Sequence, residues 1–91
     1  MVGGTNTSGV TVSNNTISNI SYTGTGSGVA YALYANTGNA ASNIIFTGNT
    51  VAGVTSAGTG TNSGLIVGGA TGGVTIQKNS FSNIKNTNTV G

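Results

Sequence analysis

The 91-residue chain contains no Asp, Glu, His, Cys, Pro or Trp, and its only charged side chains are Lys78 and Lys85. Without carboxylates, acid–base catalysis of the glycosidase kind and carboxylate calcium binding are excluded for this segment. Without His or Cys, zinc sites and triad-type nucleophilic catalysis are excluded as well. A lone lysine base would need strong desolvation, and both lysines stand among polar residues. The sequence therefore predicts a chain that is not an enzyme and holds no cofactor or metal.

The same scarcity limits the partners. Two isolated lysines do not form the clustered basic surface that nucleic acid binding needs. No apolar run approaches the ~20 residues that span a bilayer. We therefore expect neither nucleic acid nor membrane as a partner. The missing cysteines exclude disulfides without deciding the compartment, and no basic-then-apolar signal segment opens the chain, so the signal of a secreted protein would lie upstream.

Polar and small residues dominate the composition, since Gly, Thr, Asn and Ser supply 56 of the 91 residues. This bias is frequent in disordered segments, where few apolar groups offset the entropy of the chain. Disordered segments are also typically charged and rich in proline, and this chain is neither. Its apolar residues recur at fixed offsets, as packing requires. We expect one small folded domain.

Three segments of the chain share one pattern: Gly9–Ile20, Asn43–Val54 and Gly73–Ile84. They are 34 and then 30 residues apart, and such repeats indicate a solenoid, in which each unit buries its apolar face against its neighbours. In register, four apolar positions and one Asn coincide. The rows are Val10/Ile44/Val74, Val12/Phe46/Ile76, Ile17/Val51/Phe81, Ile20/Val54/Ile84 and Asn15/Asn49/Asn79.

Each copy has the pattern of two short strands joined by a corner. Val10–Val12 alternates apolar and polar residues, Asn14 and Asn15 form a turn pair, and Thr16–Ile20 resumes the alternation. A helix is disfavoured because β-branched residues, Gly and Asn prevail and no apolar stripe of helical period occurs.

A third kind of strand precedes the second and third copies, in Ser27–Tyr34 and Ser63–Gly68, after loops rich in Gly, Thr and Ser. We align Val29 and Tyr31 with Leu65 and Val67 and expect all four side chains to point inward, with Ala30, Ala32 and Tyr34 outward. One period then holds three strands and describes one coil of a parallel β-helix.

The stretches Val10–Ile20 and Val74–Ile84 resemble repeats of right-handed parallel β-helices of the pectate-lyase type, as in secreted bacterial or phage fibre and adhesin proteins. The resemblance covers essentially the whole chain. It implies an all-β, right-handed parallel β-helix of about three coils with three short strands each. It also implies an asparagine ladder at one corner, in which Asn15, Asn49 and Asn79 stack and bond to one another and to corner backbone groups.

The chain is expected to form a single solenoid segment. Met1–Gly4 resembles Ile66–Gly69, the end of the third kind of strand. No polar cap is recognisable at either end, so we expect end-to-end stacking with copies of the chain or contact with flanking coils of a longer chain. The expected units are coil one at 10–43, coil two at 44–73, and a third coil at 74–91 completed by 1–9 of the same or a neighbouring chain.

Two kinds of surface residue are candidates for binding. Tyr22, expected on the first loop, and the outward Tyr34 are the candidates for stacking on sugar rings, whereas Tyr31 is expected in the core. Thr16, Thr50 and Ser80 should form an outward row of the kind seen on ice-binding faces. The other outward row, Thr11, Ile45 and Thr75, is interrupted by Ile.

These observations predict a structural solenoid segment of an extracellular fibre, adhesin or stalk, located outside the cell or at its surface. The alternative is a carbohydrate-binding or non-catalytic part of a polysaccharide-active β-helix protein, with a glycan as its partner. An ice-binding face is a third interpretation.

Overall fold

The computed structural model describes residues 1–4, 7–69 and 71–88. Short strands make up the regular structure of these residues, and turns or loops join them. The strands are β1 (Val2–Gly3), β2 (Thr11–Ser13), β3 (Thr16–Tyr22), β4 (Ala30–Asn36), β5 (Ile44–Thr47), β6 (Thr50–Ser56), β7 (Asn62–Val67), β8 (Val74–Gln77) and β9 (Ser80–Asn86).

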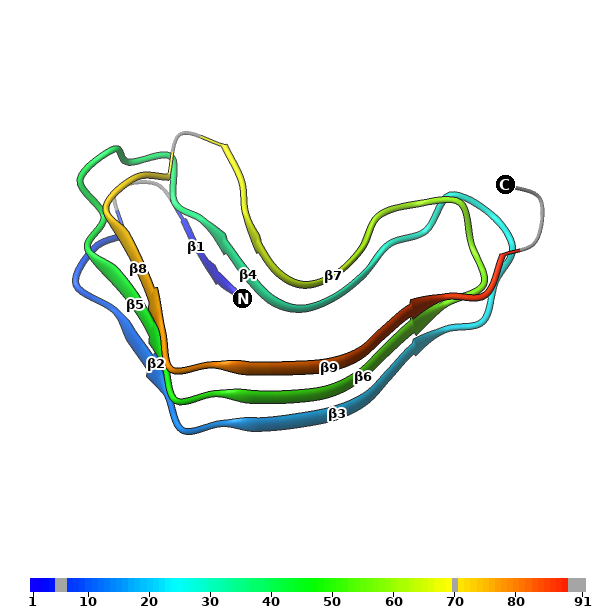
Figure 1. The fold of residues 1–91 in the computed structure, drawn as a ribbon. Coiled ribbons are helices and arrows are strands. Elements are labelled where there is room, and N and C mark those ends of the chain that lie inside the picture. Colours follow the sequence, from blue (N-terminus) through cyan, green and yellow to red (C-terminus); the bar gives the residue numbers. More distant parts are fainter. Residues whose placement is uncertain (5–6, 70, 89–91) are drawn as a thin grey trace.

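The strands form three parallel sheets of three strands each, in the orders β1-β4-β7, β2-β5-β8 and β3-β6-β9. Each strand therefore pairs with the strand three places further along the chain, so the backbone makes one circuit between paired strands. Figure 1 shows the three sheets as the walls of a stack of coils, with β3, β6 and β9 lying one above another. The prediction of an all-β, parallel solenoid is confirmed.

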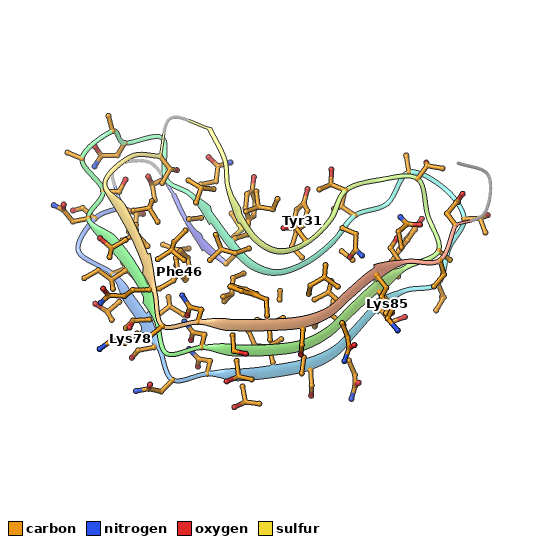
Figure 2. All side chains as sticks on the ribbon, in the orientation of Figure 1. Tyr31, Phe46, Lys78 and Lys85 are labelled. Carbon is orange, nitrogen blue, oxygen red and sulfur yellow. The ribbon has the colours of Figure 1, made fainter. Side chains whose placement is uncertain are left out.

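The apolar rows expected from the sequence pair in the expected register. Val12 pairs with Phe46 and Phe46 with Ile76, and the rows of Ile17 and Ile20 continue in the same way to Phe81 and Ile84. The core is deepest in coil two, where Phe46 lies on the inner side of β5 (Figure 2). Its row neighbours on both sides cover it. The fully buried apolar side chains of this coil are Ile44, Phe46, Val51 and Val54.

A bend in β3, β6 and β9 lets two residues of each strand face the core although they are three positions apart. Along a regular strand, side chains three apart point to opposite faces. Asn19, Gly53 and Asn83, which stand at equivalent positions inside these strands, have φ values of 60°, 100° and 56°. This left-handed conformation suits Asn and Gly and reverses the alternation. The bend is visible along all three strands in Figure 1.

The alignment expected for the third kind of strand was wrong. Leu33 pairs with Leu65 and Ala35 with Val67, four residues away from the expected partners. Val29 is 49% exposed, whereas Ala30 is buried at 4%. Two features separate the structure from the expectation: residues 23–29 form a loop two residues longer than the equivalent residues 57–61, and Ala30 and Leu33, three positions apart, both face the core. The apolar pattern of so short a strand does not reveal such an insertion.

The first strand occupies the third-strand position of the sheet, as its sequence suggested. Val2 pairs with Ala35, which in turn pairs with Val67. In this chain β1 lies beside β4, on the side away from β7. Completion of the third coil by 1–9 of a neighbouring chain stays a prediction, and residues 5–6 and 89–91 of that closing segment lie outside the described residues.

The corner before the asparagine row leads to a first prediction. Asn14, Gly48 and Lys78 stand there with φ of 56°, 67° and 57°. A lysine in this left-handed conformation costs about 1 kcal/mol, a strain that Asn tolerates better. We expect Lys78→Asn to raise the free energy of unfolding by about 1 kcal/mol in urea titrations. Lys85→Asn, which removes the same charge from regular strand β9, is the control; equal effects would contradict the backbone explanation.

Candidate functional site

The asparagine row stacks at the corner between the β2-β5-β8 and β3-β6-β9 sheets. The Asn15 backbone N–H and Nδ2 both donate to Asn49 Oδ1, at 3.1 and 3.0 Å. The Asn49 backbone N–H and Nδ2 donate in the same way to Asn79 Oδ1, both at 2.9 Å. The side-chain oxygens of Asn49 and Asn79 therefore each receive a pair of hydrogen bonds from the preceding coil.

The amides also satisfy backbone carbonyls at the corner. Asn49 Nδ2 donates to the Val12 carbonyl and Asn79 Nδ2 to the Phe46 carbonyl, each at 2.9 Å. Asn49 thus uses both side-chain donors and accepts two bonds, which is the full capacity of an amide. Its side chain is fully buried. The asparagine ladder expected at Asn15, Asn49 and Asn79 is present as a set of buried and half-buried hydrogen bonds.

A second polar cluster lies at the corner between β4 and β5, and sequence reasoning missed it. The Thr71 hydroxyl accepts from the Thr37 backbone N–H at 2.6 Å, and the Thr37 and Ser42 hydroxyls are 2.5 Å apart. Thr37 and Ser42 are buried at 1% or less. The available signal was the separation of Thr37 from Thr71, which are 34 residues apart like Asn15 and Asn49. Both corners that carry a buried polar cluster are therefore hydrogen-bonded to the neighbouring coil.

Two tyrosines form a pair on the outer face of β4. The ring centroids of Tyr31 and Tyr34 are 5.5 Å apart, and the rings are tilted by 47°. Figure 2 shows Tyr31 on the side of β4 turned away from β3, β6 and β9, so the expectation that Tyr31 belongs to the core was wrong. Ala30 and Leu33 both face the core although they are three positions apart, so the strand bends between them and Tyr31 points outward.

Tyr34 is held in place by its neighbours, in the outward orientation expected for it. Asn36 Nδ2 donates to the Tyr34 hydroxyl at 3.1 Å. A Cβ at Gly68 would stand 3.2 Å from the Tyr34 ring, which shows that the ring lies close against β7. Tyr31 and Tyr34 are each half-buried, so part of each ring faces solvent. The pair therefore offers an aromatic surface fixed before any ligand arrives.

Tyr22 takes a different position from the one expected. It is the last residue of β3 rather than a loop residue, and it packs against the core. A Cβ added at Gly24, Gly28 or Gly58 would collide with its ring, because the glycine loops pack over it. A hollow of about 250 Å³ beside the ring is lined mainly by apolar atoms of residues such as Thr55, Ser56 and Ala57. A sugar-stacking role for Tyr22 stays a prediction, with a ring that these loops partly cover.

The outward hydroxyl row has the expected register. Thr16 pairs with Thr50 and Thr50 with Ser80, and all three are exposed. The other row pairs Thr11, Ile45 and Thr75, so an apolar side chain interrupts it as expected. Ice binding by these rows stays a prediction that a thermal-hysteresis measurement would test.

The lysines are separated on the surface. Lys78 stands at the ladder corner and Lys85 at the far end of β9, and both are exposed (Figure 2). Among residues 1–4, 7–69 and 71–88, no helix is long and apolar enough to cross a membrane.

Comparison of the chain with known proteins found no match: no protein-family model, no curated protein and no solved structure corresponds to it. The function is therefore argued from the arrangement of the residues alone.

Removing one amide from the centre of the ladder tests its contribution to stability. Asn49→Ala deletes four part-buried hydrogen bonds, and the hydrogen-bonding groups of Asn15 and Asn79 lose their partner in the central coil. We expect the free energy of unfolding to fall by about 1–3 kcal/mol. Thr50→Ala, at the exposed neighbouring position, is the matched control and should change stability little. An Asn49→Ala protein as stable as the wild type would contradict a stabilising role of the ladder.

A carboxylate in the ladder should make stability depend on pH. In Asn49→Asp one carboxylate oxygen would still accept from the Asn15 N–H groups, but the other would face the Val12 carbonyl and Asn79 Oδ1, both acceptors. Complete burial and these two acceptors outweigh the Asn15 donors, so the pKa of the introduced carboxyl rises above its unfolded value of ~3.9. The variant should then be most stable below pH ~4 and lose stability as the pH rises through the folded pKa. The wild type has no Asp, Glu or His and should show a nearly flat profile over the same range.

Proposed function

We propose that this chain is a structural segment of a β-solenoid, part of a rigid extracellular fibre, adhesin or stalk. The observation that carries the proposal is the unbroken ladder of amides from Asn15 through Asn49 to Asn79, with apolar rows that run parallel to it. The most buried polar and apolar groups of the chain stack coil upon coil. The backbone of a stack held in this way is stiff along its axis.

The dimensions agree with a repeating role. The described residues measure 40 × 24 × 16 Å, whereas three strands stacked at about 4.8 Å span only about 10 Å from the first to the last. Each coil thus adds little length and a broad cross-section. A long spacer is obtained by adding coils, and repetition of one pattern supplies them.

The surface chemistry supports an extracellular location. The outward positions carry mainly Thr, Ser, Asn and Ala, and the chain has a formal net charge of only +2. Such a surface is hydrated without strong attraction to nucleic acid or charged membranes. The finer assignment, a right-handed β-helix of the pectate-lyase type without catalytic residues, rests on the resemblance of the repeats.

Surface labelling tests the structural assignment. An antibody raised against the folded chain should stain intact cells or particles that make the protein, and external protease should remove the stain. Staining only after permeabilisation would contradict the extracellular role.

The tyrosine pair supports a second candidate, binding of a neutral glycan on the outer face of β4. Aromatic faces stack on the apolar faces of sugar rings, and the hydroxyl and amide groups of Ser63 and Asn36 stand beside the tyrosines. The outward residues of β4 and β7 carry no charge, which favours a neutral over an acidic saccharide.

A glycan array separates the two candidates. If the second holds, the wild type binds a neutral oligosaccharide, and Tyr31→Ala or Tyr34→Ala lowers the affinity at least tenfold while the thermal melting curve is retained. Thr50→Ala, on another outward face, is the control and should bind like the wild type. An array without specific binding would remove the carbohydrate candidate and leave the structural one.

A further inference from the structure

One face of the stack exposes side chains of the kind that the rest of the fold buries. Three of the inward side chains of β8 and β9 are 36% to 49% exposed: Ile76, Phe81 and Ile84. The residues that precede them in the same rows are at most 1% exposed: Phe46, Val51 and Val54. In coil two, the next coil covers each of these rows. The exposed face of coil three therefore presents the same kind of apolar side chains that form the contacts between coils inside the chain.

The opposite face presents the matching surface. Val12, Ile17 and Ile20 begin the same three rows, and each is half-buried. Beneath them, β2 and β3 have one paired edge, towards β5 and β6, and one edge without a partner strand in their sheets. Unpaired edges of this kind readily accept another parallel strand.

Hydrogen bonding gives the two faces opposite character. In each internal step of the ladder, the backbone N–H and Nδ2 of one Asn donate to the Oδ1 of the next. At one end, the Asn79 backbone N–H has no acceptor within the described part of the chain. At the other end, Asn15 Oδ1 accepts no hydrogen bond from these residues. A donor face thus stands at coil three and an acceptor face at coil one.

The position of β1 agrees with the same geometry. In this chain Val2 lies beside Ala35 of β4, whereas no strand of the described residues takes the equivalent place beside Val67 of β7, and Val67 is 41% exposed. The β1 strand of a second copy stacked in register would lie beside β7. It would supply the third strand that coil three requires.

Charge does not oppose such stacking. Lys78 and Lys85 both belong to coil three, and the residues of a second copy that would lie next to them in the rows are Asn14 and Ser21. The lysines of successive copies would be three coils apart, about 14 Å, which exceeds the Debye length of about 10 Å at 0.1 M salt.

We propose that the coil-three face of one copy binds the coil-one face of a second copy, so that the asparagine ladder, the apolar rows and the β1 sheet continue from copy to copy. The stacking deepens the proposed structural function and depends on it. The contact is head to tail and does not close, so it generates a filament rather than a dimer.

Cysteine cross-linking tests the register. The row Ser13, Thr47, Gln77 faces outward, and the chain has no cysteine of its own. Stacked copies would bring Gln77 of one copy to about 4.8 Å from Ser13 of the next, within disulfide range. A mixture of Gln77→Cys and Ser13→Cys should therefore form an oxidised heterodimer. Thr47→Cys mixed with Ser13→Cys is the control, since those positions would be two coils apart.

Blocking one face at a time tests the assembly. Ile84→Lys places a charge on the coil-three face, Ile20→Lys on the coil-one face, and Thr50→Lys on an outward position of coil two as the matched control. In sedimentation, the wild type and Thr50→Lys should grow in mass with concentration. Each blocked variant alone should be monomeric, and their 1:1 mixture should give dimers and nothing larger.

A wild-type chain that stays a folded monomer at every concentration and gives no Gln77–Ser13 cross-link would overturn the stacking, while a cooperative melt of that monomer would leave the structural solenoid in place. If a blocked variant does not fold, the cross-linking pair decides alone, because its substitutions stand at exposed positions.

Discussion

The pairing of each strand with the strand one coil away is the constraint on which the rest of this molecule depends. Parallel pairing in register places every side chain beside its equivalent in the next coil. A residue type that is favourable once is then favourable in every coil, which is why the apolar rows and the asparagine row both run along the stack. The same constraint allows a chain with so few apolar residues to fold, since each buried side chain covers two neighbours.

Asparagine suits the corner because its amide both donates and accepts along the stack. Asn49 joins coil one, through the Val12 carbonyl, to coil three, through Asn79 Oδ1. The bonds from each Asn to the Oδ1 of the next Asn all point towards coil three, so the ladder gives the stack a polarity. The left-handed residue before each ladder position turns the chain into the corner, and Asn14 and Gly48 adopt this conformation with less strain than Lys78 does.

The stacking of coils uses the interior of the solenoid, and the proposed stacking of copies would use its two end faces. Neither uses the outer surface. The Tyr31–Tyr34 pair stands on that free surface, held by Asn36 and by the close approach to Gly68. A structural role and a glycan-binding role would therefore use different residues and could coexist in one chain.

The sequence alone determined the repeat, the apolar rows and the ladder positions, because in-register stacking requires similar residues at equivalent positions of successive repeats. Only the tertiary structure decided the third strand, where the length of the preceding loop sets the register and a bend between Ala30 and Leu33 turns Tyr31 away from the core. It also decided the bend at Asn19, which depends on a backbone angle that no apolar pattern reports, and the buried contact between Thr37 and Ser42. A constraint that repeats in every coil leaves a periodic pattern that can be recognised in the sequence. Loop lengths and local backbone conformations leave no such pattern, and their effect on register and side-chain direction appears only when distant segments pack together.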